Sequence, residues 1–385
     1  MQLSKLKGLC GSLAILMSTL AHSQPAGKPI YVGQLASVTN PISSGNAKEF
    51  ISGIELAFER VNRAGGIKGR PLKLVTKDDQ FDANKSVGLT TELVAESDIV
   101  AMVGNFGTPS LMKLAAEGTL EKLQMASIGP VTGLQSALDK PNMFAVRGSY
   151  EDEVLAMLNH ATRIGRARIA YLYFEAGVGI QLAKLAPDMA KAAGVQLVDI
   201  QGFPITPERA LQEAAVTKSL ATLGDKSFDA MVLIAVGVAH SEAVKAVRKR
   251  YGKGMPIYSL GQVNPATLVK DVGTDLAAGV MLTQVMPSPG SRAMAIVRDY
   301  QADRLAYQPA NVPSYMALEG YIAASIAGEL IKRAKAVDRP SVLASASGAG
   351  QLNVRDFAVS YGATKRKSLN TIEITMVNSD GKLIR

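Results

Sequence analysis

The chain has 385 residues, of which 47% are apolar and 19% charged, so two or three domains with substantial cores are possible. Its formal net charge is +9, but the basic residues are scattered, with tight clusters only at 248–250 and 365–367. A nucleic-acid-binding surface would show a denser basic stripe with interleaved aromatic residues, so we expect no nucleic-acid partner.

Residues 1–23 have the pattern of a secretory signal peptide. A charged start precedes a short apolar segment, 8–20, and small residues stand at positions −3 and −1 of a cleavage site before Gln24. The apolar segment is too short to span a bilayer. Cys10, the only cysteine, lies inside it, so the mature chain has no disulfide, no thiolate nucleophile and no cysteine zinc site. We therefore expect a periplasmic protein.

The first half of the mature chain alternates apolar strands with helices. Apolar residues recur at helical spacing through 51–61, and Gly65-Gly66 is suited to end that helix. Helices are also expected at 86–95 and after Pro109. Strands are expected at 29–35, 71–75, 99–103, 125–128 and 143–146.

A second set of alternating elements begins at Tyr150, after a break at 147–150. Strands are expected at 168–174, 195–200, 229–236, 257–260 and 279–285, with helices between them. Such alternation predicts right-handed crossovers and an α/β fold of two doubly wound, parallel-sheet lobes. A helix-rich run at 294–335 and an antiparallel edge at 371–377 complete the chain.

The stretch 99–110 carries the first candidate binding site. Its strand ends at Gly104, and Thr108-Pro109 predicts a helix start, with Thr108 as N-cap and Pro109 as the first helical residue. The end of a strand followed by the start of a helix can form a small-anion site. An ordinary, well-capped turn is the alternative.

A second turn of similar composition, Gly129 to Gly133, follows the next strand. Turns at the carboxyl ends of neighbouring strands lie side by side in a doubly wound sheet, where ligands of this architecture bind. The hydroxyls of Thr108 and Thr132, with backbone N–H groups, would suit a carboxylate held between two lobes.

Patterns typical of enzymes are weak. Gly177-Val-Gly179 resembles part of a dinucleotide fingerprint, but Leu182 stands at the third glycine position. His160 and His240 lie on predicted helices without a neighbouring second ligand, and the acidic group 78–82 lacks a calcium-loop spacing. We expect no enzyme, no metal and no cofactor.

Several short motifs follow one another along the mature chain: Ile30-Tyr-Val-Gly-Gln, 62–71 with Asp78-Asp79, 103–108, 129–133, 144–150, 282–289 and 314–323. Their order and spacing resemble those of periplasmic solute-binding proteins of ABC transporters, in the branched-chain amino acid (Leu/Ile/Val-binding) family.

This resemblance implies three crossovers between the lobes, near 147–150, 285–287 and 337–340. Lobe 1 would then comprise 28–149 and 285–337, and lobe 2 would comprise 150–284 and 338–385. The resemblance also implies closure of the lobes over a ligand. Candidate ligand-binding residues are Phe106, Thr108, Ser110, Pro130, Thr132, Val178, Gln262 and Gln284.

The half of the site that would hold an ammonium group departs from the family pattern. Val178 replaces an aromatic residue, and the loop 260–264 lacks the expected acid. A buried ammonium without a carboxylate would be costly. We therefore expect an organic or aromatic acid without an obligatory α-amino group, its far end bonded by Gln262, Asn264 or Gln284. Glu175 could supply the missing acid, in which case amino acids stay possible.

The expected role is solute capture by a monomer, with an ABC permease and ATPase as partners. A sensory binding protein that reports to a membrane receptor is the alternative, since both roles need only a pair of lobes that close on a ligand.

Overall fold

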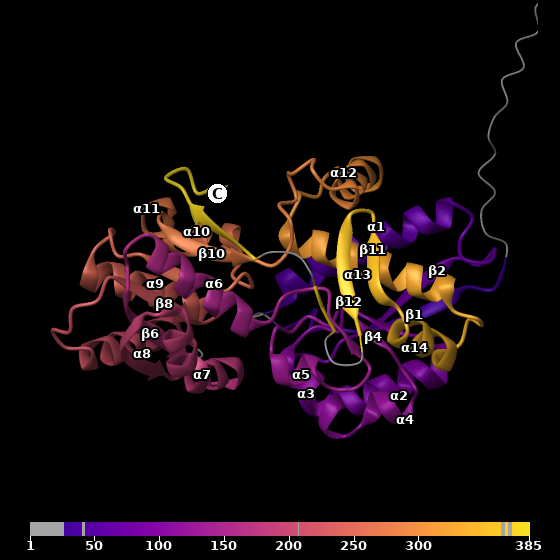
Figure 1. The fold of residues 1–385 in the computed structure, drawn as a ribbon, viewed down its shortest axis with the longest axis horizontal. Helices are drawn as coiled ribbons and strands as arrows, with labels where there is room; N and C mark the ends of the chain where they lie inside the picture. The colour runs from indigo at the N-terminus through magenta and orange to yellow at the C-terminus, as the bar shows by residue number, and fades with distance from the viewer. Residues whose placement is uncertain (1–26, 41–42, 207, 363–365, 369–371) are drawn as a thin grey trace, which may run out of the picture.

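The computed structural model describes residues 27–40, 43–206, 208–362, 366–368 and 372–385. The predicted signal peptide, its cleavage site and Cys10 lie outside these residues. The described chain forms two lobes that stand side by side, joined by connecting segments (Figure 1). The predicted fold class, two doubly wound lobes joined by three crossovers, is confirmed.

Lobe 1 is built on a parallel sheet in the order β2-β1-β3-β4-β5. Its strands are β1 Ile30–Leu35, β2 Leu72–Lys77, β3 Met102–Val103, β4 Ser127–Ile128 and β5 Met143–Phe144. Its helices are α1 Ser44–Arg63, α2 Ser86–Ser97, α3 Thr108–Ala116, α4 Thr119–Lys122, α5 Gln135–Leu138, α12 Ala295–Tyr307, α13 Tyr315–Arg333 and α14 Arg339–Ser347, with a 3₁₀ turn, η1, at Ala83–Lys85.

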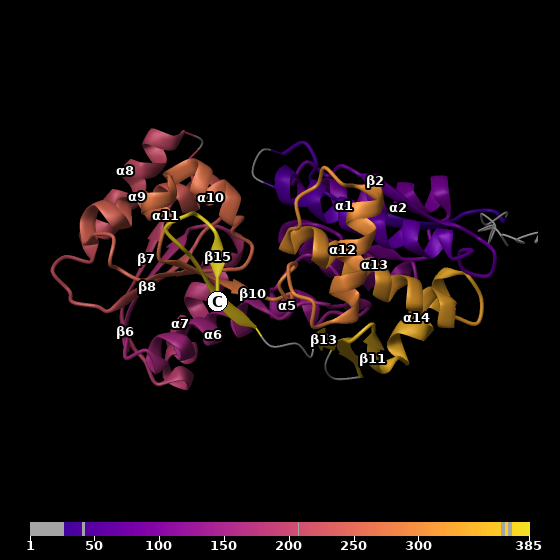
Figure 2. The same cartoon turned by 90° about the horizontal axis from the view of Figure 1, so that it is seen from above.

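The strands of lobe 1 bury both faces, as parallel strands do. Val32 and Val103 face a core covered by α1 and α13, whereas Leu35 and Met102 face a second core under α2, α3 and α4. Figure 1 shows α1 and α13 on one side of these strands and α2, α3 and α4 on the other, and Figure 2 shows the two lobes from above.

Helices α1 and α13 approach each other so closely that glycine is required on both. A Cβ on Gly53 would lie 1.8 Å from the carbonyl oxygen of Ala317, and one on Gly320 would lie 2.0 Å from that of Phe50. Most of α13 is buried between α1 and the rest of the lobe. This helix, which follows the second crossover, is therefore central to lobe 1.

Lobe 2 is built on a mixed sheet in the order β15-β14-β10-β9-β8-β6-β7. The strands β6 to β10 are mutually parallel, and β14 joins β10 in antiparallel fashion. Its strands are β6 Arg168–Phe174, β7 Gln196–Phe203, β8 Ala230–Ile234, β9 Ile257–Ser259, β10 Val280–Gln284, β14 Glu373–Val377 and β15 Leu383–Ile384. Its helices are α6 Tyr150–Arg163, α7 Gly177–Ala193, α8 Arg209–Thr222, α9 Gly237–Tyr251, α10 Pro265–Val272 and α11 Thr274–Ala277.

The assignment of 338–385 to lobe 2 is wrong for its first part. Helix α14 and a small sheet of β11 Gly350–Val354, β12 Phe357–Tyr361 and β13 Arg366–Ser368 follow residue 338. Val342, Phe357 and Tyr361 pack in the α1–α13 core of lobe 1. The third crossover therefore lies between β13 and β14 rather than at 337–340. The apolar face of this small sheet needs a core to cover it, and lobe 1 provides it.

Among the described residues, no helix is both long and apolar enough to cross a bilayer. The same residues contain no group of three or more histidine, cysteine or acidic side chains placed to hold a metal ion.

Candidate functional site

The turns that follow β3 and β4 lie side by side at the carboxyl edge of the lobe 1 sheet. The N–H of Val131 donates to the carbonyl of Asn105 at 2.8 Å, and Phe106 forms a parallel bridge with Val131. The N–H of Phe106 in turn donates to Leu35 at the end of β1. The backbone thus brings together the two turns that the sequence singled out.

Helix α3 begins one residue earlier than expected. Its N-cap is Gly107, with φ 115°, and Thr108 and Pro109 occupy its first positions. Thr108 is therefore not the N-cap, and its hydroxyl lies 2.9 Å from that of Thr132. No side chain caps the first turn of α3, so its N–H groups and its dipole still favour an anion there.

A chain of hydrogen-bonding side chains runs from these turns into lobe 2. The hydroxyl of Thr108 lies near that of Tyr150, the first residue of α6, and the amide of Gln262 donates to the Tyr150 hydroxyl. We call Thr132, Thr108, Tyr150 and Gln262 the polar chain. Burial raises the pKa of Tyr150 to about 12, so its hydroxyl stays protonated at neutral pH. The polar chain therefore offers uncharged hydrogen-bonding groups from both lobes.

The lobes touch beside the polar chain. The side-chain amide of Asn46 on α1 donates to the carbonyl of Gln262 at 3.2 Å. Asn264, the N-cap of α10, donates to Asn46 and to Glu49, both at 3.4 Å. Helix α3 also contacts α7 across the interface. Asn264, expected at the far end of a ligand, is used for the helix cap and for lobe contacts.

Ser110 has a different role from the one expected. It is buried and donates to Oδ2 of Asp79 at 2.5 Å. The other oxygen of Asp79 accepts from the hydroxyl of Ser37 at 2.5 Å and from the N–H of Phe81 at 3.0 Å. Asp79 thus ties together the loops after β1 and β2 and the first turn of α3. Ser110 therefore supports the site through Asp79, to which its hydroxyl proton is donated.

Gln284 is also engaged elsewhere. It is buried at the end of β10, and its amide donates to the hydroxyl of Thr375 on β14 at 3.1 Å. The expectation that it bonds a ligand is therefore not supported. A residue at a strand end next to a crossover matches the pattern of a site residue, but pairing with β14 uses its side chain.

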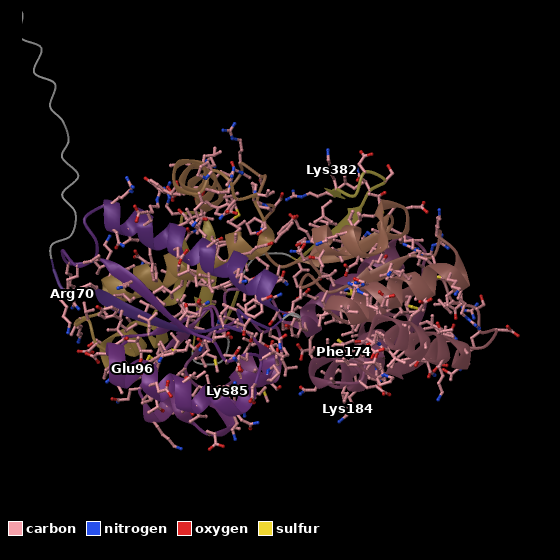
Figure 3. The ribbon with its side chains drawn as sticks, turned by 180° about the vertical axis from the view of Figure 1, so that it is seen from behind. Arg70, Lys85, Glu96, Phe174, Lys184 and Lys382 are labelled. Atoms are coloured by element: carbon pink, nitrogen blue, oxygen red, sulfur yellow. The ribbon has the colours of Figure 1, made fainter. Side chains whose placement is uncertain are left out.

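The remaining candidates lie in the turns after β3 and β4 and at the start of α7. Phe106 is buried with its ring in a T-shaped contact with Phe50, at a centroid distance of 6.3 Å, and Pro130 is buried in the adjoining turn. Val178 is half-buried in the first turn of α7. Glu175 is exposed and lies over Gly202 of β7; the neighbouring Phe174 is marked in Figure 3.

The sequence reasoning missed Tyr150 and Glu151. Tyr150 is the last residue of the motif 144–150 and directly follows the first crossover. This position was the signal that could have identified it. Glu151 accepts from the N–H of Gln135 on α5, at 3.3 and 3.4 Å from its two oxygens. Burial raises the pKa of Glu151, which adjoins the polar chain at Tyr150.

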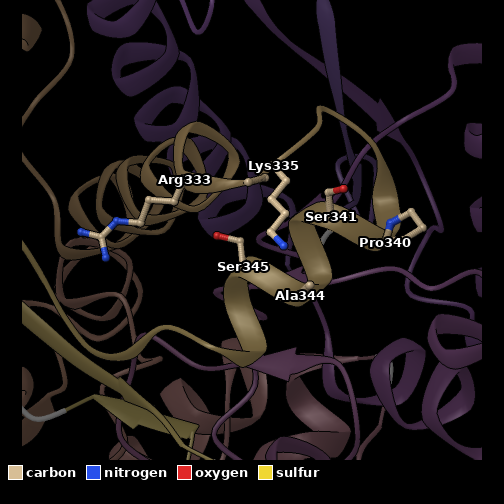
Figure 4. A pocket seen from close by; sticks show the side chains of 7 residues that line it. Arg333, Lys335, Pro340, Ser341, Ala344 and Ser345 are labelled. Atoms are coloured by element: carbon tan, nitrogen blue, oxygen red, sulfur yellow. The ribbon is translucent and has the colours of Figure 1, made fainter.

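A separate hollow of about 370 Å³ lies on lobe 1 between the end of α13 and α14 (Figure 4). Lys335, Ser341 and Ser345 are among its lining residues, and none of the polar chain lines it. It is therefore not part of the candidate site.

Comparison with known proteins identifies the family. A family model described as "Periplasmic binding protein" matches residues 29–382, nearly all of the described chain. The chain belongs to the periplasmic binding protein family. Members of this family bind ligands rather than transform them and act outside the cytoplasm, so the expectation that the protein is no enzyme is confirmed.

Individual relatives agree with this family. A Leu/Ile/Val-binding protein homolog 7 of Brucella melitensis is 26% identical over 197 residues, 48% of each chain. The chain thus aligns with about half the length of the curated relatives it matches. A substrate-binding periplasmic protein from Ralstonia solanacearum has a TM-score of 0.82 at 26% identity, covering 92% of this chain and 99% of the other.

The fold is shared with more distant binding proteins. A fatty acid ABC transporter substrate-binding protein from Thermomonospora curvata has a TM-score of 0.78 at 17% identity, covering 94% of this chain and 92% of its own.

Proposed function

We propose that this periplasmic binding protein captures a small carboxylate-bearing solute between its lobes and delivers it to the permease and ATPase of an ABC importer. The polar chain is the observation that supports this proposal, because it extends from the turns of lobe 1 to α6 and the β9–α10 loop of lobe 2. A ligand that bonds Thr108 and Tyr150 together favours the arrangement with the lobes in contact.

A carboxylate matches the donors that surround the polar chain. The uncapped first turn of α3 supplies N–H groups and the positive end of a helix dipole, and Thr108 and Tyr150 supply hydroxyls. Hydrogen bonds from neutral donors to a charged acceptor are stronger than those between neutral groups.

We further propose that the ligand needs no α-amino group. The polar chain itself contains no acid, and an ammonium buried against it would lack a partner. Names of similar proteins include both a Leu/Ile/Val-binding homologue and a fatty acid transporter component, so either class fits the fold. Glu175, Glu151 and Glu49 are the acids that would have to serve an amino acid ligand.

A matched set of probes tests the proposal on the chain starting at Gln24. Leucine, 4-methylpentanoate and 3-methylbutylamine share one branched skeleton. Leucine carries both charged groups, 4-methylpentanoate carries only the carboxylate, and 3-methylbutylamine carries only the ammonium group. A ligand at 100 times its Kd adds about 2.7 kcal/mol to the free energy of unfolding, which a thermal-shift assay detects.

Stabilisation by 4-methylpentanoate or another plain carboxylate is the expected result. Stabilisation by leucine alone would retain the capture role and overturn the proposed ligand class. Stabilisation by the amine alone, or by no member of a wider screen of aliphatic and aromatic acids and amino acids, would contradict carboxylate capture.

A further inference from the structure

Three charged side chains are buried together where the first crossover joins the lobes. Arg147 lies between β5 and α6 and is 0% exposed; Glu153 is 0% exposed and Glu319 is 1% exposed. Arg147 places one guanidinium nitrogen 3.4 Å from Glu153 and another 3.6 Å from Glu319. We call these three residues the hinge cluster. Buried charges of this kind are costly unless they are paired, so their placement constrains the fold strongly.

The two acids come from opposite lobes. Glu319 is on α13, the central helix of lobe 1, and Glu153 is on α6, the first helix of lobe 2. Arg147 is on the segment that connects the lobes. A change in the angle between the lobes must therefore alter at least one of the two separations. In a low-dielectric environment, attraction between charges depends steeply on such separations.

Glu153 also links the hinge cluster to the binding site. One of its oxygens accepts from the N–H of Gly261 at 2.8 Å and from the hydroxyl of Thr283. Gly261 directly precedes Gln262 of the polar chain, and Thr283 lies at the end of β10 before the second crossover. The guanidinium of Arg147 lies 5.7 Å from the ring centroid of Tyr150. The hinge cluster therefore contacts the first crossover, the end of β10 before the second crossover, and the two parts of the binding site that contain Tyr150 and Gln262.

The ion pairs of the hinge cluster are not at their best geometry in this arrangement. Separations of 3.4 and 3.6 Å are longer than those of good charge-assisted hydrogen bonds, about 2.7–2.9 Å. Among the described residues, both carboxylate oxygens of Glu319 and two nitrogens of Arg147 have no hydrogen-bond partner. A different lobe angle can improve one pair at the expense of the other, so the cluster favours particular angles rather than a continuous range.

From this geometry we infer that Arg147, Glu153 and Glu319 are positioning residues that set the orientation of the lobes and, through Gly261, the placement of the Gln262 loop. The inference rests on the proposed function only in that lobe orientation governs capture. Its test needs no ligand, so its failure and that of the proposed ligand can be told apart.

The experiment measures the lobe arrangement directly. The chain from Gln24 onward contains no cysteine. Spin labels therefore attach only at two introduced cysteines, Lys85→Cys in lobe 1 and Lys184→Cys in lobe 2. Both positions are exposed and marked in Figure 3. Pulsed dipolar spectroscopy of the ligand-free protein then gives the distribution of distances between the lobes.

Glu319→Gln is the decisive variant, because it keeps the side chain's shape and removes the attraction to Arg147. The ratio of the label-distance populations is expected to change by about threefold or more, because Arg147 is then attracted to Glu153 of lobe 2 alone. Glu329→Gln makes the same change on the same helix at a residue paired with Arg333, far from the crossovers, and is expected to leave the distribution unchanged.

Glu153→Gln and the charge-retaining Glu319→Asp provide further tests. Glu153→Gln removes the competing pair and is expected to shift the distribution in the opposite direction, whereas Glu319→Asp keeps the charge and is expected to give a smaller shift than Glu319→Gln. A lower Tm with an unchanged distance distribution in the folded variants would mean that the cluster serves stability alone. That result, or a shift in Glu329→Gln as large as in Glu319→Gln, would overturn the inference.

Discussion

Thr108 and Thr132 are 24 residues apart in the chain, yet their hydroxyl oxygens lie 2.9 Å from each other. The contact exists because β3 and β4 are adjacent parallel strands and their turns begin at the same edge of the sheet. One hydroxyl of the pair can donate to a ligand while it accepts from the other. The pair is thus a preorganised part of the polar chain.

Thr108→Val should weaken the binding of 4-methylpentanoate, or of another carboxylate that the screen identifies. The isosteric change removes one donor to a charged group, which corresponds to about 1.5–3 kcal/mol and so to about a 10- to 150-fold higher Kd. Isothermal titration measures the effect. Thr91→Val, on the exposed face of α2, is the matched control. Equal Kd values for the two variants would show that the Thr108 hydroxyl does not contact the ligand.

Ser110→Ala should lower stability more than affinity. Asp79 is fully buried, and loss of the Ser110 hydroxyl leaves one of its oxygens without that donor, which costs about 1–3 kcal/mol in the free energy of unfolding. Urea unfolding of the ligand-free protein measures this cost. A normal unfolding curve together with a large loss of affinity would instead identify Ser110 as a ligand contact.

Gly53→Ala should be strongly destabilising, because its Cβ would overlap the backbone of α13 at Ala317. Forcing the helices apart costs about 1–3 kcal/mol or more. Gly45→Ala lies on the same helix with open space around it, and is expected to change stability by no more than about 1 kcal/mol. Thermal or urea unfolding compares the two variants, and equal stabilities would contradict the close packing of α1 and α13.

His240 should make stability depend on pH. It is fully buried on α9 and hydrogen-bonded to Ser259, and burial lowers its pKa to about 3. Because the unfolded chain has a histidine pKa of about 6.5, only that chain takes up the proton as pH falls below this value. The contribution of His240 to the free energy of unfolding is fully present above pH 6.5. It is lost as the pH falls toward 3, at about 1.4 kcal/mol per pH unit.

The His240→Gln variant isolates this effect, because glutamine cannot titrate. Between pH 6.5 and pH 5, the unfolding free energy of the unaltered protein should fall by about 2 kcal/mol more than that of the variant. Parallel pH profiles would show that His240 is not held neutral by burial.

The alternation of strands and helices was enough to predict two doubly wound lobes, because burial on both faces makes parallel strands continuously apolar. Residues 350–361 show why the third crossover was misplaced. Their pattern of alternating burial suits an edge of either lobe, and only the core around Phe357 and Tyr361 decides between them. The local sequence does not show which of the two lobes this segment joins.

The sequence predicted that the two turns lie side by side, and it predicted less well which side chains are free of other partners there. Backbone pairing fixed the positions of Phe106 and Thr132, which follow from strand order. For Ser110 and Gln284 the sequence did not show the buried partner distant in sequence, Asp79 or Thr375, that bonds each side chain. Tyr150 was not identified from the sequence, because its contact with Gln262 depends on the angle between the lobes.

Lobe 1 is assembled from two separate parts of the chain, and this affects the order in which the protein can fold. Its main core joins residues from Ile30 to Val146 with residues from Val285 to Tyr361. The strands β6 to β10 of lobe 2 lie in one uninterrupted stretch. Long loops delay the formation of distant contacts. When the chain is synthesised from its N-terminus, β6 to β10 of lobe 2 are therefore complete before α13 is made. Strands β1 to β5 can form the full core of lobe 1 only after α13 has been added.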